Sequence, residues 1–288
     1  MTDIEPLPAS LWEPIVRAAL AEDLGDAGDL TSQTTLPPDA TADGHVVARA
    51  AGVIAGLDVA LSAFRFLDGA APVEIERLLT DGTEVGPGVA VARVAGPVHV
   101  LLGAERTALN LLGHLSGIAT ATRELVRRVE GTGARITDTR KTTPGLRALE
   151  KYAVRCGGGV NHRLGLHDAV LIKDNHIVAV GNVGEAVRRA RAEVPPGIAI
   201  QVEVDDLTQL EEALAAGAEM ILLDNMPPAR LREAVQRTAG RALLEASGGI
   251  TPETVRAVAE TGVDRISVGW ITHSAPALDV ALDLSAKE

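Results

Sequence analysis

Aromatic side chains are scarce in this sequence: Phe, Trp and Tyr together make up 2% of its 288 residues. A protein that binds single-stranded nucleic acid by stacking bases on aromatic rings needs more of them, so that class is disfavoured. The hydrophobic residues nevertheless amount to 46%, and most are Ala, Val, Leu and Ile. Such a composition suits helices packed on aliphatic strands and allows a sizeable buried core.

Cysteine and positive charge are also in short supply. The single cysteine, Cys156, excludes an intramolecular disulfide and a cysteine cluster for zinc or iron–sulfur. The formal net charge of -12 argues against a general nucleic-acid or membrane-surface binder, because both need a broad cationic face. A local cationic pocket remains compatible with this charge.

Long apolar runs are missing as well. No uninterrupted apolar stretch approaches the ~20 residues that cross a bilayer. The first residues, MTDIEPLPAS, lack the cationic start and apolar run of a signal peptide. We therefore expect a cytoplasmic protein, and the length of 288 residues suits one large domain or two smaller ones.

The first part of the chain, up to about residue 103, has a mixed pattern. Residues 11–24 show helical periodicity, and several short Val-rich runs follow, such as HVVARAAGVIAG, PVEIERLL and VAVARVAGPVHVLL. These runs predict a small α+β domain with an antiparallel sheet. A long amphipathic helix is predicted over 103–130. We expect the domain to span residues 1–115, with the C-terminal tail of the chain packed back against it.

From about residue 134 the pattern becomes regular. Six times, an apolar β-branched run ends in polar or glycine residues and is followed by a helical segment. The last four strand ends, Glu203, Asp224, Ser247 and Gly269, are 21, 23 and 22 residues apart. This repetition predicts parallel strands with right-handed crossovers. We favour a TIM-type barrel over residues 116–288, because residues capable of chemistry follow every strand and a closed barrel brings all strand ends to one mouth.

The predicted strand ends carry charge of both signs. Residues 138–176 hold seven Lys and Arg against four Asp and Glu, a formal charge of +3 in an acidic chain. Arg140, Lys141 and Lys173 directly follow apolar strands, where we expect them to point into the mouth. Glu203 and Asp224 end the two middle strands. Their carboxylates suit hydroxyl binding, magnesium binding or stabilisation of a developing positive charge, or they simply balance the lysines.

The last two units carry glycine-rich turns. In SGGITPETVRAV, Gly248 and Gly249 permit close backbone approach just before a predicted helix whose amides can bind an anion. Gly269 stands at the next strand end, and loops after the last two barrel strands often form a phosphate site. We therefore expect a ligand with several acidic groups, a polyol centre and a phosphate.

These residues stand in strings that resemble the quinolinate phosphoribosyltransferase family. The signature region is DTRKTTPGLRALEKYAVRCGGGVNHRLGLHDAVLIKDNHI (138–177), and the resemblance extends over nearly the whole chain. Further matching strings, in the expected order, are EDLGDAGDLTS (22–32), AERTALNLLGHLSGIAT (104–120), VEVDDL (202–207), ILLDNM (221–226), LEASGGI (244–250) and ISVGWITHSAP (266–276).

The resemblance implies a fold and a reaction. The fold is an N-terminal open sandwich followed by an incomplete barrel of seven strands, one more than the six counted here. In the reaction, quinolinate attacks phosphoribosyl pyrophosphate, pyrophosphate leaves with magnesium, and decarboxylation gives nicotinate mononucleotide for NAD synthesis. Family members are dimers or larger assemblies in which each active site borrows an arginine from a neighbouring subunit.

The resemblance also implies roles for individual residues. The two substrate carboxylates are bound by a cationic box, and Glu203 and Asp224 hold the ribose hydroxyls and magnesium. Lys141 and Lys173 also lie where pyrophosphate leaves. The cationic box is Arg140, His162, Arg163 and Lys173, with Arg106 from the partner subunit. Thr139 joins the substrate-binding set, and the 5′-phosphate cradle comprises Ser247, Gly248, Gly249, Val268, Gly269 and Trp270, with His273 as an extra donor.

Two other functions fit parts of the pattern. A Schiff-base aldolase on the same barrel would use Lys173 as its nucleophile, since a strand-end lysine in an electropositive mouth can have a lowered pKa. A non-catalytic protein that binds a phosphate ligand would need only the glycine turns. Family relatives associated with molybdenum transport differ in chemistry, and the complete cationic box favours a dicarboxylate substrate over theirs.

Overall fold

The computed structural model describes residues 4–67 and 72–286 of the chain. Its described residues form two compact units, and three separate segments contribute to the first one. Unit 1 comprises residues 1–123, 143–158 and 274–288, and unit 2 comprises residues 124–142 and 159–273.

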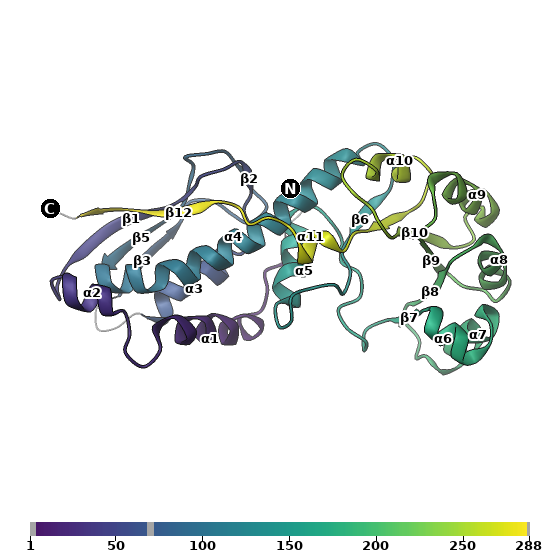
Figure 1. The fold of residues 1–288 in the computed structure, drawn as a ribbon, viewed down its shortest axis with the longest axis horizontal. Helices are drawn as coiled ribbons and strands as arrows, with labels where there is room; N and C mark the ends of the chain where they lie inside the picture. Colours follow the sequence, from purple (N-terminus) through teal and green to yellow (C-terminus); the bar gives the residue numbers. More distant parts are fainter. Residues whose placement is uncertain (1–3, 68–71, 287–288) are drawn as a thin grey trace. The chain divides into compact units, whose positions relative to one another are not determined.

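Unit 1 is built on an antiparallel four-stranded sheet in the order β12-β1-β5-β3. The last strand of the chain pairs with the first, so that Val46 lies opposite Leu282. A small β2-β4 pair completes the strands, and Figure 1 shows α1, α3 and the first part of α4 along one side of the sheet. The strands are β1 (Thr41–Ala48), β2 (Gly52–Val53), β3 (Glu74–Arg77), β4 (Glu84–Val85), β5 (Ala90–Pro97) and β12 (Val280–Ala286). The helices are η1 (Ala9–Leu11), α1 (Glu13–Leu24), α2 (Leu30–Thr35), α3 (Leu57–Phe66), α4 (Val98–Arg128) and α5 (Arg147–Cys156).

The long helix α4 starts earlier than the sequence pattern predicts. The prediction placed VHVLL in a strand and began the helix at residue 103, whereas α4 begins at Val98. Pro97 ends β5 because proline has no amide hydrogen for the ladder. Beyond it, Leu101, Ala104 and Ala108 recur at helical spacing and are buried.

Unit 2 contains a parallel six-stranded sheet in the order β6-β11-β10-β9-β8-β7. Each strand is followed by a helical segment, and Figure 1 shows α7, α8, α9 and α10 along the outer side of the strands. The strands are β6 (Arg135–Thr137), β7 (Val170–Ile172), β8 (Ile200–Val204), β9 (Met220–Asp224), β10 (Leu243–Ser247) and β11 (Arg265–Ser267). The helices are α6 (Asp174–Val180), α7 (Val183–Glu193), α8 (Leu207–Ala215), α9 (Pro228–Thr238), α10 (Val255–Ala259) and α11 (Trp270–His273).

The α/β fold class predicted from the sequence is confirmed, with the barrel incomplete. A seventh strand, expected from the resemblance, is reduced in the described residues to a single parallel bridge between Val160 and Thr137. One residue of pairing is too short to show as an apolar run, which explains why the sequence pattern gave six strands.

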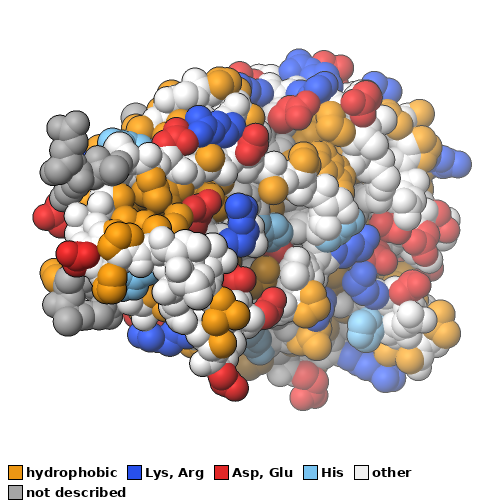
Figure 2. All heavy atoms as spheres, turned by 60° about the vertical axis from the view of Figure 1, so that its left-hand side comes forward, with side chains coloured by type: hydrophobic (Ala, Val, Ile, Leu, Met, Phe, Trp, Pro, Cys, Tyr) orange, Lys and Arg blue, Asp and Glu red, His pale blue; other side chains and the backbone are white. Residues whose placement is uncertain are grey.

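Charged side chains of both signs are visible on one face of the molecule (Figure 2). On the face drawn in Figure 2, Lys and Arg side chains lie scattered among acidic and apolar ones. On that face, the described residues form no broad cationic patch.

Candidate active site

A pocket of about 540 Å³ lies at the carboxyl ends of the parallel strands of unit 2. Side chains alternate between the two faces of a strand, so every second side chain of β8, β9 and β10 points to the same face of the sheet. The register then sets Asp224 beside Ser247 and Glu203 beside Leu222. The lining residues are Thr139, Arg140, Lys141, His162, Arg163, Leu171, Lys173, Glu203, Leu222, Asp224, Asn225, Glu245, Ser247, Gly248, Gly249 and Ser267.

Two arginines with unused hydrogen-bond donors face this pocket. The Nε groups of Arg140 and Arg163 are buried and have no hydrogen-bond partner among the described residues. Burial and the nearby charge of Arg140 lower the pKa of Arg163, whose Nη1 donates to the Ala169 carbonyl at 3.1 Å. Two close cations with spare donors favour an anion between them, because a carboxylate accepts from guanidinium groups in a bidentate manner.

The acidic part of the pocket is formed by neighbouring strands. Burial raises the pKa of Glu203, and the charges of Asp224 and Asp174 raise it further. The ammonium of Lys173, 3.3 Å from the Glu203 carboxylate, opposes this rise. Two close carboxylates, one of which has a raised pKa, suit a ligand that brings hydroxyl groups or a cation.

The turn after β9 supports the glycine turn after β10. Asn225 adopts a left-handed backbone (φ 53°), and its side-chain amide donates to Asp224 Oδ2 at 2.6 Å. The backbone N–H of Asn225 donates to the Ser247 carbonyl at 2.8 Å, which ties the end of β9 to the end of β10. Gly248 has φ +96°, and a Cβ there would lie 2.0 Å from Asn225 Oδ1. The turn after β10 therefore requires glycine at this position.

Lys141 lies beside the other glycine turn. A Cβ on Gly269 would lie 2.9 Å from Lys141 Cδ, 3.5 Å from Thr139 Oγ1 and 3.6 Å from His273 Nε2. The Thr272 hydroxyl donates to the Lys141 carbonyl at 2.8 Å. Lys141 lies against the glycine turn after β11 because β6 pairs with β11.

A buried polar cluster forms the floor near His162. Asp138, which is fully buried, accepts the His162 N–H at 2.9 Å. The His162 ring contacts the Gln201 side chain at 2.9 Å, and Gln201 donates to Glu245 at 3.1 Å. These contacts hold the loop that carries His162 and Arg163 against β8 and β10.

The structure brings together most, but not all, of the residues predicted for the site. Arg106 lies on α4 in unit 1, with its side chain 63% exposed. Predicted residues that line the pocket are Thr139, Arg140, Lys141, His162, Arg163, Lys173, Glu203, Asp224, Ser247, Gly248 and Gly249. Val268, Gly269, Trp270 and His273 are in the adjoining turn and outside this lining.

Five lining residues were missed by the sequence reasoning. Asn225 and Ser267 stand at strand ends, so the strand-end rule that found Asp224 could have found them. Glu245 had a further signal: it is an acid in the middle of an apolar strand. The missed residues are Leu171, Leu222, Asn225, Glu245 and Ser267.

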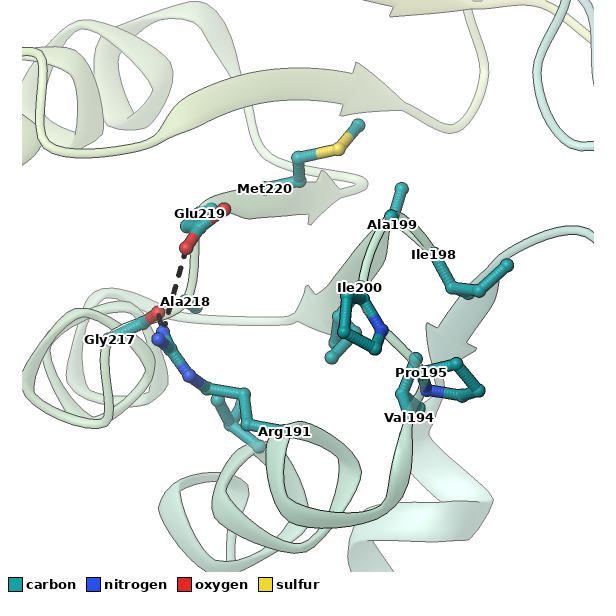
Figure 3. A pocket seen from close by; sticks show the side chains of 13 residues that line it. Arg191, Val194, Pro195, Ile198, Ala199, Ile200, Gly217, Ala218, Glu219 and Met220 are labelled. Carbon is teal, nitrogen blue, oxygen red and sulfur yellow. Dashed lines mark hydrogen bonds and ion pairs between the residues drawn. The ribbon is translucent and has the colours of Figure 1, made fainter.

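A second hollow, of about 260 Å³, lies at the amino ends of β8 and β9. Figure 3 shows Pro195, Ile198 and Ile200 around it, with Arg191 reaching toward Glu219 and the Gly217 carbonyl. Its walls are largely apolar side chains and backbone, and it is at the opposite end of the strands from the charged pocket. Barrel chemistry resides at the carboxyl ends, so this hollow is not the candidate site.

The fold and the pocket together define a class of protein. A parallel, barrel-like sheet whose carboxyl ends carry paired arginines, paired acids and glycine turns is an α/β enzyme for a polyanionic, phosphorylated small ligand. Family models place the chain within that class. The quinolinate phosphoribosyl transferase N-terminal domain matches residues 29–116, and the C-terminal domain matches residues 118–283.

The chain belongs to the quinolinate phosphoribosyl transferase family. It is 50% identical over 272 residues to a nicotinate-nucleotide pyrophosphorylase [carboxylating] from Mycobacterium leprae, covering 93% of this chain and 95% of the relative. A probable enzyme of the same name from Bacillus subtilis is 45% identical, with coverage of 92% and 90%. The solved nicotinate-nucleotide pyrophosphorylase from Francisella tularensis has a TM-score of 0.93 and 38% identity, covering 99% of this chain and 100% of that chain.

Within residues 4–67 and 72–286, no helix is both long enough and apolar enough to cross a bilayer.

Proposed function

We propose that this chain transfers the phosphoribosyl group of phosphoribosyl pyrophosphate to quinolinate, with decarboxylation, in NAD biosynthesis. The products are nicotinate mononucleotide, pyrophosphate and carbon dioxide. The pocket arrangement carries the proposal: two arginines with unused donors, two close carboxylates and the glycine turn after β10 line one cavity. Family membership supports the same substrates.

The cationic residues bind and orient the dicarboxylate. Arg140 and Arg163 supply donors to the substrate carboxylates, Lys173 adds a third cation, and His162 completes the wall of the box. The pyridine nitrogen then forms a bond to the anomeric carbon as the bond to pyrophosphate breaks. Because the substrate nitrogen is the nucleophile, the protein contributes placement and charge stabilisation rather than a covalent intermediate.

Lys141 and the glycine turns serve the phosphate groups. Lys141 and Lys173 offset the charge of the departing pyrophosphate. The carboxylates of Glu203 and Asp224 bind the ribose hydroxyls and stabilise positive charge at the anomeric carbon. Loss of carbon dioxide leaves an electron pair on the ring carbon, which takes up a proton. The cradle for the 5′-phosphate comprises Ser247, Gly248, Gly249, Val268, Gly269 and Trp270, with His273 as a donor and Thr139 nearby.

Magnesium fits the acidic part of the pocket. Glu203 and Asp224 offer hard oxygen ligands, and they are close enough for the charge of Asp224 to raise the pKa of Glu203. Within the described part of the chain, no group of three or more His, Cys, Asp or Glu could hold a metal by itself. We therefore propose that magnesium takes its other ligands from phosphoribosyl pyrophosphate and water.

We further propose a homo-oligomer, a dimer or a hexamer, in which Arg106 enters the pocket of a neighbouring subunit. Its guanidinium is exposed and lies 3.9 Å from Glu105, a contact long enough to leave the side chain available to a partner. Arg106→Ala and Lys173→Ala should each be inactive alone. Subunit exchange between them should restore about a quarter of the wild-type activity, because half of the dimers are mixed and each has one intact site.

A matched control separates sharing from other causes of recovery. Arg163→Ala mixed with Lys173→Ala should stay inactive, because both side chains belong to one pocket and no mixed dimer has an intact one. Equal recovery in both mixtures, or recovery in neither despite verified subunit exchange, would rule out the shared site.

The direct test of the function is an assay of purified protein with magnesium, quinolinate and phosphoribosyl pyrophosphate. Ultraviolet detection should show nicotinate mononucleotide, and no product under these conditions would refute the proposal. We also propose the functional domains 1–115 and 116–288, because the two family models meet between residues 116 and 118. A cytoplasmic location stays a prediction from the sequence.

The two alternative functions are less well supported. A Schiff-base nucleophile needs an uncharged, desolvated amine, whereas the Lys173 side chain is 49% exposed and pairs with Glu203. A protein that only binds a phosphate ligand would have no use for paired arginines and paired acids in the same cavity.

A further inference from the structure

We propose that Glu245 is a positioning residue of this pocket, which acts through Gln201 to fix the ring of His162 and, with it, the backbone of Arg163. The inference rests on the proposed function, because it assigns His162 and Arg163 to the binding of the dicarboxylate. No role for Glu245 follows from the strand-end pattern, since it lies in the middle of β10.

The first observation is the burial of the Glu245 carboxylate. Glu245 is 0% exposed and lines the pocket, two residues before Ser247 on the same face of β10. An ionised carboxylate in such a place is costly unless hydrogen bonds or charges compensate. Its Oε2 accepts from Gln201 at 3.1 Å, and its Oε1, which has no hydrogen-bond partner in the described part of the chain, lies 3.6 Å from His162 Nε2. The buried carboxylate of Glu245 is therefore compensated mainly by its hydrogen bond from Gln201 and by the nearby ring of His162.

The second observation is that the hydrogen bonds run in one direction. The N–H of Arg163 donates to His162 Nδ1 at 2.7 Å, so this nitrogen carries no proton. The proton of the neutral ring is then on Nε2, which donates to Gln201 Oε1 at 2.9 Å. The Gln201 amide group in turn donates to Glu245. An ionised Glu245 accepts only, so it fixes the orientation of the Gln201 amide and, through it, the tautomer of the ring.

The orientation of the His162 ring also affects the binding of the dicarboxylate. The same His162 ring accepts the backbone N–H of Arg163, while Asp138 accepts the N–H of His162. The ring therefore helps to set the backbone from which the Arg163 guanidinium extends into the pocket. If the Gln201 amide flips, its NH2 group instead of its oxygen faces Nε2 of His162. The ring must then accept a hydrogen bond at Nε2. It either carries its proton on Nδ1 and loses the bond from the Arg163 N–H, or it rotates. Binding of the dicarboxylate should suffer, and binding of phosphoribosyl pyrophosphate should not.

The test compares Glu245→Gln with the exchange variant Gln201→Glu/Glu245→Gln. Glu245→Gln keeps the volume but removes the charge, so both orientations of the Gln201 amide become possible. The exchange variant places a carboxylate next to the ring and an amide at position 245 that can donate to it. The direction of hydrogen bonding is thereby restored with the same side-chain types at the same two positions.

Two readouts distinguish positioning from bulk stability. In ¹⁵N-histidine spectra, with His162 assigned by comparison with His162→Gln, the wild type should show the Nε2–H tautomer and Glu245→Gln a mixture. The KM for quinolinate should rise about tenfold in Glu245→Gln, the effect expected for a weakened charge-assisted contact, with the KM for phosphoribosyl pyrophosphate within about twofold. The exchange variant should recover the tautomer and most of the KM for quinolinate.

Several outcomes would overturn the inference. The wild-type spectrum alone does so if His162 carries its proton on Nδ1, and this holds even if the variants fail to fold. A folded Glu245→Gln protein with the wild-type tautomer and KM also does so, as does an exchange variant that folds without recovery. The spectrum needs no turnover, so failure of the proposed reaction and failure of this inference are separate results.

Discussion

Replacement of Arg163 by methionine should reduce substrate binding strongly without a matching loss of stability. The charge-assisted hydrogen bonds of a guanidinium to a carboxylate are worth about 1.5–3 kcal/mol. Their loss should raise the KM for quinolinate about 10- to 150-fold. Methionine keeps much of the apolar stem, so the expected loss belongs to the charged group.

The effect on folding has contributions of opposite sign. The lowered pKa of Arg163 means that the fold opposes its charge at neutral pH, through burial and the nearby Arg140. The neutral side chain relieves this opposition but loses the bond to the Ala169 carbonyl. We expect the two to offset each other, with a change in the free energy of unfolding within about 1 kcal/mol.

Urea denaturation and steady-state kinetics measure the two quantities in the same preparation. Arg189→Met is the matched control, because the Arg189 side chain is 64% exposed and pairs with Glu185 on the surface of α7. It should cost about 0.3–0.5 kcal/mol and leave both KM values unchanged. If Arg163→Met lowers the free energy of unfolding by more than about 2 kcal/mol, Arg163 is a structural residue and the binding role assigned to it is refuted.

Three further predictions concern other parts of the molecule. Gly248→Ala should cost about 1–3 kcal/mol in urea denaturation and raise the KM for phosphoribosyl pyrophosphate, because its φ is +96° and the Cβ meets Asn225; Gly249→Ala, with φ +60° and open space, should cost about 1 kcal/mol. In the proposed reaction Glu203 acts as a carboxylate, so kcat/KM should fall as the pH drops through its raised pKa, and Asp174→Asn should move this limb to lower pH. Burial raises the pKa of the Cys156 thiol to about 12, so mass spectrometry should find it unmodified by iodoacetamide at pH 8 until the protein unfolds.

The regular part of the fold was accessible from the sequence because it repeats. The strand ends at Asp224 and Ser247 were predicted and observed, since each apolar run of β9 and β10 stops where its side chains meet solvent. The start of α4 was not, because VHVLL is apolar enough for either a strand or a buried helix. Proline at position 97 was the available signal, and the pattern of burial after it decides for the helix.

Whether a pocket residue could be predicted from the sequence depended on where it stands in its strand and which contacts it makes. Arg140 and Lys173 were found because they follow apolar strands directly. Asn225 has a left-handed backbone, and its side chain packs against the turn after β10. This contact joins the ends of two strands, so no local sequence pattern encodes it. Glu245 lies in the middle of a strand, and its contacts with Gln201 and His162 come from residues 44 and 83 positions away in the chain.

The order of the strands in the sheet separates the surroundings of the two adjacent cations in TRKTTPGLR (139–147), Arg140 and Lys141. Along the chain, Lys141 and Gly269 stand at opposite ends of the parallel repeat. In the sheet, β6 pairs with β11, and Lys141 therefore lies against the turn that carries Gly269. Arg140, one residue earlier, lines the same pocket near Arg163. In the proposed reaction, two adjacent cations therefore serve different substrates: the arginine a carboxylate of quinolinate, and the lysine a phosphate of phosphoribosyl pyrophosphate. The proposed function thus accounts for the positive charge at this point of an acidic chain, because a single strand end would contact both anionic substrates.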